Sequence, residues 1–400
     1  MLVPATLYRK GLDLKHIVAD ELSRDYHSDL VTRMRGTDGR HAEGRLTVHL
    51  PREFGFCYGV DRAVDYAYQT RRRFPDRTVY LTGEIIHNSH VNDRLREAGV
   101  RFLSDPGERL EDVGAQDVVI LPAFGVTVSD LERLDRRGCT LVDTTCGSVL
   151  NVWKNVRQYA RDGYTAVIHG KARHEETRAT ASQVRAAGGG AYLIVLDRDE
   201  AAEVCEYIAG RGDRERFVAR FGDACSAGFD PDRDLRRVGL ANQTTMLMSE
   251  SLAIGEMLRQ AMTNRYGDAS LEAHYRAFDT ICSATQDRQD AVRVLLGERD
   301  FDLVIVIGGY NSSNTRNLAR ICAERAPSYH IAGPSCLASR DRIRHLPSPN
   351  GVAGPRREVA ADGWLPATGP LVVAVTAGAS TPDSIVGQVV SRLAELAGDS

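Results

Sequence analysis

Short apolar runs alternate with amphipathic segments along most of this 400-residue chain. From residue 45 onward, runs rich in Val, Ile and Leu are typical of buried strands, and most precede a segment with apolar residues at helical spacing. Strands are predicted at 77–83, 117–122, 139–145, 165–169, 191–196, 236–241, 303–308, 328–332 and 371–377. The clearest helices are predicted at 130–137, 246–263, 314–325 and 382–397. This alternation predicts an α/β fold with largely parallel sheets, whose catalytic groups lie at the carboxyl ends of strands.

Three segments break the pattern. Residues 1–44 are polar, contain a break at 36–39, and are predicted to form an appended helical arm. Segments 210–235 and 334–368 are rich in charge, Gly and Pro, and are predicted to be surface loops or insertions. The chain length exceeds one ordinary domain and suggests two or three.

Composition narrows the possible partners. A hydrophobic content of 42% and a charged content of 26% are typical of a soluble globular protein. The net charge of −3 gives no bulk electrostatic reason to expect nucleic acid or an anionic membrane as a partner. No apolar run approaches the roughly 18–20 residues that cross a bilayer, and the first residues contain no signal-peptide core. We therefore expect a cytoplasmic protein whose cysteines stay reduced.

Three of the eight cysteines are each predicted to lie where an apolar strand gives way to a helix: Cys57, Cys146 and Cys282. A helix N-terminus favours the thiolate, which binds iron and zinc. Three thiolates are one ligand short of a closed four-cysteine site and would leave a metal position open to substrate. The spacing alone does not decide between ligands and buried thiols. The others are interpreted as structural: Cys139, Cys205, Cys225, Cys322 and Cys336.

Two polar loops, 311–314 and 378–383, each lie between a predicted parallel strand and a helix. They place hydroxyls and free backbone N–H groups at a helix N-terminus, which suits an anion. Ser, Thr and Asn also cap helices without binding anything. With a third polar turn at 243–245, a phosphate or diphosphate ligand is as credible as simple capping.

Histidine and glutamate occur at two further strand ends. His87 follows the predicted strand at 77–83, and His174 lies two residues before Glu176 at a strand-to-helix turn. An imidazolium could bind an anion there, and a carboxyl group could supply a proton. His169 could do similar work, and the pattern does not rank these histidines.

Taken together, these motifs resemble the 4-hydroxy-3-methylbut-2-enyl diphosphate reductase family, which is also called LytB or IspH. Eight blocks recur in the order of the family and span roughly residues 45–395: 54–64, 84–88, 142–146, 169–176, 242–246, 278–282, 311–314 and 376–383. The arm at 1–44 and the segment 123–125 resemble the plastid-type branch of the family, which also occurs in bacteria. A location in the plastid stroma would follow only for a plastid-bearing source.

The resemblance implies three α/β domains around a pseudo-threefold centre. Their expected bounds are 59–146, 147–278, and 45–58 together with 279–398, after the arm at 1–44. Each domain would supply one cysteine, so that Cys57, Cys146 and Cys282 would hold one [4Fe–4S] cluster with an open apical iron.

The resemblance also implies a reaction. The family reduces an allylic alcohol diphosphate to isopentenyl and dimethylallyl diphosphate, the last step of the methylerythritol phosphate route to isoprenoids, with electrons from ferredoxin or flavodoxin. Glu176 would be the proton donor, with Thr244 helping to place it. Substrate contacts would come from Thr244 and from residues that hold the diphosphate: His87, His174, Ser312, Ser313, Asn314 and Ser380.

The chain departs from the family pattern at three positions. Phe124 stands where many members have His, although the plastid-type branch also has Phe there, and Gly147 and Asn151 replace a usual Pro and Lys. The main alternative enzyme is an iron–sulfur hydro-lyase, which needs no external electrons. A second alternative is a non-catalytic cluster or zinc protein in which His174 or His87 completes a Cys3His site.

Overall fold

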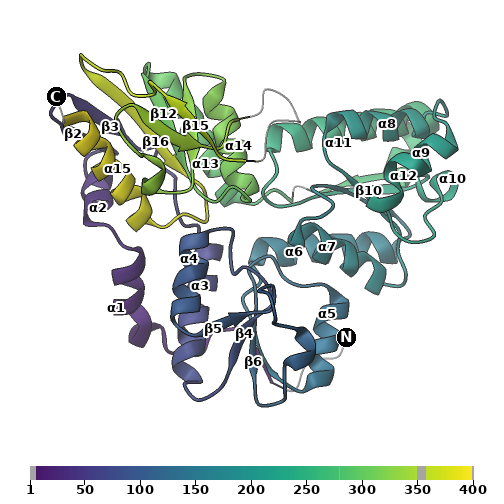
Figure 1. The fold of residues 1–400 in the computed structure, drawn as a ribbon. Helices are drawn as coiled ribbons and strands as arrows, with labels where there is room; N and C mark the ends of the chain where they lie inside the picture. Colours follow the sequence, from purple (N-terminus) through teal and green to yellow (C-terminus); the bar gives the residue numbers. More distant parts are fainter. Residues whose placement is uncertain (1–5, 279, 349–356, 399–400) are drawn as a thin grey trace. The chain divides into compact units, whose positions relative to one another are not determined.

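The computed structural model describes residues 6–278, 280–348 and 357–398, which form an α/β fold (Figure 1). The chain divides into two compact units. Unit 1 comprises Met1–Arg9, Tyr80–Gly83 and Leu103–Cys282. Unit 2 comprises Lys10–Val79, Glu84–Phe102 and Ser283–Ser400. In the described part of the chain, no helix is both long enough and apolar enough to cross a membrane.

Unit 1 contains two largely parallel sheets. Its strands are β1 (Leu7–Tyr8), most of β4 (Val79–Leu81), β6 (Val118–Leu121), β7 (Thr140–Asp143), β8 (Thr165–His169), β9 (Tyr192–Val195), β10 (Val238–Asn242) and β11 (Tyr275–Ala277). Its α-helices are α5 (Val128–Arg137), α6 (Gly147–Arg161), α7 (Glu175–Ala186), α8 (Arg198–Ile208), α9 (Arg214–Phe221), α10 (Pro231–Asp234), α11 (Met248–Tyr266) and α12 (Leu271–His274). Strands β1, β7 and β6 are neighbours in one sheet, and the other has the order β11-β10-β8-β9.

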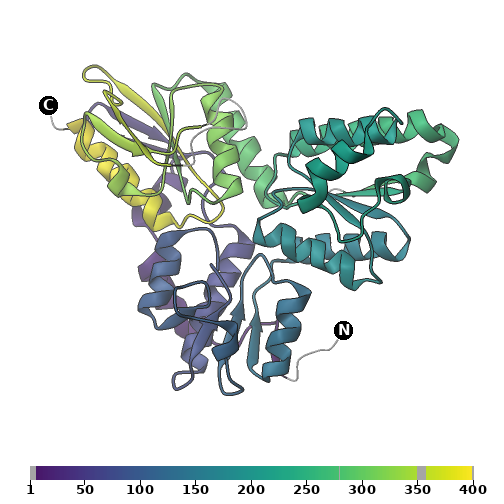
Figure 2. The same ribbon diagram turned by 45° about the vertical axis from the view of Figure 1, so that its right-hand side comes forward.

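The second of these sheets is covered on both faces, because side chains alternate along each strand. Val167 of β8 packs into a core with α8 and α11, whereas its neighbours Ala166 and Ile168 pack into a separate core with α6 and α7. Figures 1 and 2 show α6 and α7 on one side of this sheet and α8 and α11 on the other. Such two-sided burial explains the continuous apolar runs that predicted these strands.

Unit 2 contains a five-stranded sheet of order β13-β12-β16-β3-β2. The strands of this unit are β2 (Arg40–Glu43), β3 (Leu46–His49), β5 (Val100–Phe102), β12 (Leu303–Ile307), β13 (Ser328–Ile331), β14 (Arg342–His345), β15 (Val359–Asp362) and β16 (Leu371–Ala377). Its helices are α1 (Lys15–Tyr26), α2 (Asp29–Arg35), α3 (Tyr58–Arg73), α4 (Ser89–Glu97), α13 (Ser283–Glu298), α14 (Ser313–Ala323) and α15 (Asp383–Gly398). Strand β3 is parallel to β16, so two segments about 320 residues apart share one core.

All nine predicted strands and all four predicted helices are present, with ends shifted by a few residues. The α/β class and the largely parallel sheets are therefore confirmed. The proposed bounds of three domains and their pseudo-threefold arrangement stay a prediction. The arm at 1–44 contains two helices, as expected, but it also contributes strands: β1 pairs with β7 in unit 1, and β2 pairs with β3 in unit 2.

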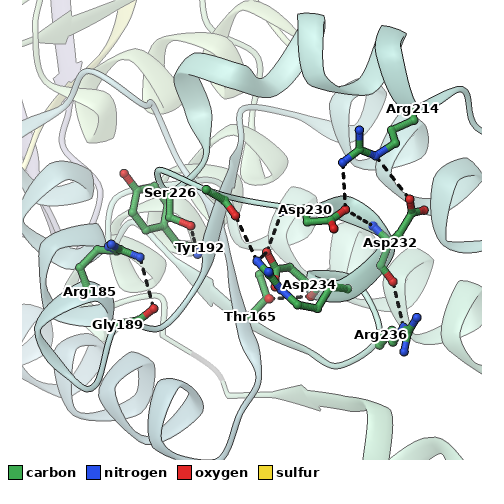
Figure 3. A network of polar contacts seen from close by, with 12 residues as sticks. Thr165, Arg185, Gly189, Tyr192, Arg214, Ser226, Asp230, Asp232, Asp234 and Arg236 are labelled. Carbon is green, nitrogen blue, oxygen red and sulfur yellow. Dashed lines mark hydrogen bonds and ion pairs between the residues drawn. The ribbon is translucent and has the colours of Figure 1, made fainter.

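Surface loops or insertions were predicted at 210–235; the loop alternative was wrong, and the insertion alternative stays a prediction. This segment contains α9 and α10 as well as a short 3₁₀ helix. Phe217 and Phe221 of α9 are buried one helical turn apart, so a charged composition concealed an amphipathic helix. Figure 3 shows how α10 is held: the hydroxyl of Thr165 on β8 donates to the carbonyl of Asp234 at 2.5 Å, and Arg214 forms ion pairs with acidic side chains of this segment.

Surface loops were also predicted at 334–368, and for the described residues 334–348 and 357–368 that prediction was wrong; residues 349–356 lie outside the described part, and the alternative of an insertion stays a prediction. Strands β14 and β15 in this segment form an antiparallel pair. Trp364 is buried and its indole N–H donates to the Ser339 carbonyl at 3.0 Å, which fixes the end of the pair against the unit 2 core. Because the strands are short and half exposed, they lack the long apolar run that marks a central strand.

Candidate active site

Each of the three predicted ligand cysteines lies directly before a helix. Cys57 is the N-cap of α3 and Cys146 is the N-cap of α6, while Cys282 immediately precedes α13. The backbone of each is anchored within its own unit: the N–H of Cys57 donates to the Ala379 carbonyl at 3.2 Å, and the N–H of Cys146 donates to that of Ala123 at 3.0 Å. All three side chains are partly exposed. A partly exposed thiol at a helix N-terminus is the environment that favours a metal-binding thiolate.

The remaining cysteines have a different environment. All eight cysteines lie in the described part of the chain and are free thiols. Burial raises the pKa of Cys205 and that of Cys322 to about 12, and it also raises the pKa of Cys225. Cys139 and Cys336 are buried. The raised pKa values of Cys205, Cys225 and Cys322 and the burial of Cys139 and Cys336 support the interpretation of all five as structural.

Glu176 and Thr244 form a buried carboxylate–hydroxyl pair in unit 1. Glu176 lies in the first turn of α7 and is only 1% exposed. The backbone N–H of Thr244 donates to Oε1 of Glu176 at 2.6 Å, and the Thr244 hydroxyl donates to Oε2 at 3.0 Å. The carbonyl of the same Thr244 accepts a hydrogen bond from the N–H of Cys282 at 3.3 Å. The structure therefore joins the predicted acid, its predicted partner and one predicted ligand within one hydrogen-bonded chain.

His174 adjoins this pair as the N-cap of α7. Its Nδ1 accepts a hydrogen bond from the Glu176 N–H at 3.2 Å, which leaves Nε2 as the ring nitrogen that can donate to a ligand. The Phe124 ring packs edge-to-face against the imidazole, with ring centroids 5.7 Å apart. Phe124 thus supports the orientation of His174 by packing, although it offers no hydrogen bond to an anion.

Gln243 is a site residue that was not predicted individually. Its side chain is buried, and Oε1 accepts hydrogen bonds from the Lys171 N–H at 3.1 Å and from the Thr177 hydroxyl at 3.2 Å. These bonds hold the turn that carries Thr244 against the start of α7. The signals in the sequence were its place in the polar turn at 243–245 and in the block 242–246 that resembles the family.

The loop before α14 carries a second group of predicted residues, all in unit 2. Ser312 is the N-cap, and its hydroxyl accepts from the Thr315 N–H at 3.3 Å. Asn314 is 2% exposed, and neither its Oδ1 nor its Nδ2 has a hydrogen-bond partner within the described residues. Because buried amides are nearly always paired in native proteins, this orphaned side chain indicates a polar ligand.

His87 and Ser380 lie beside this loop. The Ser380 hydroxyl donates to the His87 carbonyl at 3.2 Å, and the His87 imidazole contacts Glu84 through Nδ1 at 2.7 Å. Gly309 approaches the same carbonyl so closely that a Cβ there would be 2.3 Å from the oxygen. Only glycine allows this contact, which brings three strand-end segments of unit 2 together.

His169 is not part of either group. It is fully buried on β8, and its Nδ1 lies 2.8 Å from the Ser251 hydroxyl. Burial lowers the pKa of His169 to about 4, so the ring is neutral near pH 7 and cannot act as an anion-binding imidazolium. Two of the three positions at which the sequence departs from the family pattern, Gly147 and Asn151, are exposed residues of α6.

Comparison with known proteins places these residues in a family. Residues 48–394 match the family model described as LytB protein. A relative from Synechococcus sp. (strain ATCC 27144), named 4-hydroxy-3-methylbut-2-enyl diphosphate reductase, is 47% identical over 97% of this chain and 95% of its own length. A relative of the same name from Gloeobacter violaceus is 48% identical over 98% of this chain and 93% of its own length.

Solved structures agree with this assignment. A structure described as (E)-4-hydroxy-3-methyl-but-2-enyl diphosphate reductase, the terminal enzyme of the non-mevalonate pathway, has a TM-score of 0.51 and 28% identity, covering 87% of this chain and 99% of that one. A Plasmodium falciparum E-1-hydroxy-2-methyl-but-2-enyl-4-diphosphate reductase, at 21% identity and a TM-score of 0.59 over 86% of each chain, supports the fold. With the family model matching most of its length, this chain belongs to the LytB family.

Proposed function

We propose that this chain reduces (E)-4-hydroxy-3-methylbut-2-enyl diphosphate to isopentenyl and dimethylallyl diphosphate. Curated relatives that cover nearly the whole chain carry the name of this reductase. The observation that carries the proposal is the buried Glu176–Thr244 pair, in which Thr244 accepts a hydrogen bond from the N–H of Cys282. It provides an acid that bulk water does not reach, beside a predicted metal ligand.

We assign one [4Fe–4S] cluster to Cys57, Cys146 and Cys282. Their helix-start positions and partial exposure fit a cluster, whereas the raised pKa values of Cys205 and Cys322 do not. When bound, such a cluster with one open iron supplies Lewis acidity and a relay for single electrons.

The protein's own contribution to the reaction is proton delivery. Loss of the substrate hydroxyl as water requires a proton at that oxygen. Glu176 holds its carboxyl 3.0 Å from the Thr244 hydroxyl, which can both donate and accept. When Glu176 is protonated and the Thr244 hydroxyl turns to accept from it, a proton can pass from Glu176 Oε2 to Thr244 Oγ1 while the Thr244 proton moves to the departing hydroxyl.

The diphosphate is assigned to His87, His174, Ser312, Ser313, Asn314 and Ser380. His174 offers its Nε2, and Asn314 offers an amide whose polar atoms have no partner within the described residues. These donors lie at strand ends and helix starts, where backbone N–H groups also favour anions. Phe124 adds shape but no hydrogen bond.

Ferredoxin or flavodoxin is the expected electron donor, and a cytoplasmic location remains our expectation. The deciding experiment is anaerobic turnover of this substrate by the iron-loaded chain with dithionite-reduced viologen. Reductant-dependent formation of the two diphosphates is the expected result. Turnover without reductant would point to a hydro-lyase instead, and a colourless, zinc-loaded, active protein would contradict the cluster assignment.

A further inference from the structure

Tyr310 occupies a defined position in the loop that carries the proposed diphosphate ligands. After β12 the chain turns between Gly309 and Ser312, and the N–H of Ser312 donates to the Gly309 carbonyl at 3.0 Å. Tyr310 and Asn311 are the two central residues of this turn, and Ser312 is the N-cap of α14. Any side chain that holds Tyr310 therefore fixes the direction in which the turn enters the helix.

The side chain of Tyr310 is held from outside the turn. Its hydroxyl donates to Oε2 of Glu358 at 2.8 Å and lies 3.8 Å from the sulfur of Cys336. Its ring packs edge-to-face on His330 at 5.1 Å, and His330 in turn contacts the Gly308 carbonyl through Nε2 at 3.0 Å. The turn is therefore clamped through both its backbone and its tyrosine.

Glu358 connects this clamp to the pair of strands β14 and β15. It immediately precedes β15, and its Oε1 accepts from Arg344 of β14 at 2.9 Å. The same guanidinium donates to the Ser335 carbonyl at 3.1 Å. Glu358 thus receives hydrogen bonds at both oxygens, from Arg344 on one side and Tyr310 on the other. Such charge-assisted bonds fix geometry better than neutral ones.

We propose that Arg344, Glu358 and Tyr310 are positioning residues that set diphosphate affinity by holding the Gly309–Ser312 turn. The β14–β15 pair is thereby a determinant of substrate binding, although none of the three side chains is assigned a contact with the substrate. This inference rests on the proposed function, because it takes the loop at 311–314 as a diphosphate site.

The test compares Tyr310→Phe and Glu358→Gln with the parent enzyme. Loosening the turn should raise KM for the allylic diphosphate about 3- to 10-fold, the scale of one net hydrogen bond, while kcat stays within about twofold. The double variant should cost no more than the larger single effect, because Tyr310→Phe removes the same Tyr310–Glu358 bond whose charge Glu358→Gln removes. Competition by inorganic diphosphate should weaken by the same factor as KM rises.

The matched control lies on the same strands. Arg342 and Asp362 form an exposed ion pair across β14 and β15, with a nitrogen–oxygen distance of 3.7 Å. Asp362→Asn should leave KM and diphosphate inhibition unchanged. If Asp362→Asn raised KM as much as Glu358→Gln, or if Glu358→Gln lowered only the melting temperature, the positioning role would be refuted. A parent enzyme that failed to reduce the substrate would instead overturn the proposed function.

Discussion

Replacing Glu176 by Gln isolates the proposed proton donor with little disturbance of shape. The amide oxygen of the Gln can still accept from the Thr244 N–H, which now lies 2.6 Å from the carboxylate. The amide nitrogen can donate to the Thr244 hydroxyl, which accepts as readily as it donates. The substitution therefore removes the ionisable proton and keeps the hydrogen-bonded pair, so loss of fold is not expected.

The magnitude follows from burial. Glu176 is 1% exposed, so bulk water has no direct access to replace it. Removal of a positioned general acid costs about 10²- to 10⁴-fold in rate, or roughly 3–5 kcal/mol in the activation barrier. We expect kcat of Glu176→Gln to fall by at least about 10²-fold. Thr244→Val removes one hydrogen bond to a charged group and should cost about 10- to 150-fold, whereas Thr244→Ser should retain most activity.

The assay is anaerobic turnover with reduced viologen, together with the iron content and absorbance of each variant. The neighbouring Glu175→Gln is the matched control, because that side chain is 58% exposed and should tolerate the change. Near-normal turnover of Glu176→Gln with an intact cluster would refute the assignment. An equal loss in Glu175→Gln would move the acid one residue along α7.

Four further predictions test the rest of the structure. Cys146→Ser should lose the expected content of about four irons per chain, whereas Cys322→Ser should keep it, as measured by iron analysis of anaerobic protein. Asn314→Ala should raise KM about 10- to 150-fold with little change in melting temperature; an unchanged KM would contradict its role. Phe124→Ala should lower the melting temperature through lost packing and leave substrate binding measurable, and complete loss of binding in a folded, iron-loaded variant would make Phe124 a shape element of the site. Burial lowers the pKa of His330 to about 4, so its stabilising contribution is complete above pH 6.5 and is lost as the pH falls toward 4. The free energy of unfolding, measured in urea, should therefore differ less between pH 7 and pH 4.5 for His330→Gln than for the parent protein.

The sequence predicted the central strands because each is buried on both faces. Residues of β8 alternate between two cores, so the whole strand is apolar and stands out. Short edge strands such as β1 and β2 were missed, since β1 has only two residues and β2 is mostly exposed, so neither contains an apolar run. Helix α9 was missed for another reason: two phenylalanines at helical spacing carry its burial, while three arginines and one glutamate make up half of its eight residues.

The candidate site could be predicted where its residues lie at strand ends, because the change from a strand pattern to a helix pattern marks those positions locally. Cys57 and Cys146 directly precede helices, and His174 caps α7, as the strand-to-helix pattern indicated. Pairing between distant residues could not be predicted. Gln243 bonds to residues 66 and 72 positions away, and nothing in its own segment specifies those partners.

The contact between Tyr310 and Glu358 shows why that distinction matters for function. The two residues are 48 positions apart, and Glu358 lies in a segment whose charge and glycine content predicted a loop. A composition of that kind measures how little apolar surface a segment buries, and it says nothing about which single side chain forms a hydrogen bond elsewhere. Catalytic groups must touch the substrate and so gather in recognisable motifs at strand ends. Residues that position those groups need not touch the substrate, so they can lie in segments without a recognisable motif. Only the structure identifies them there.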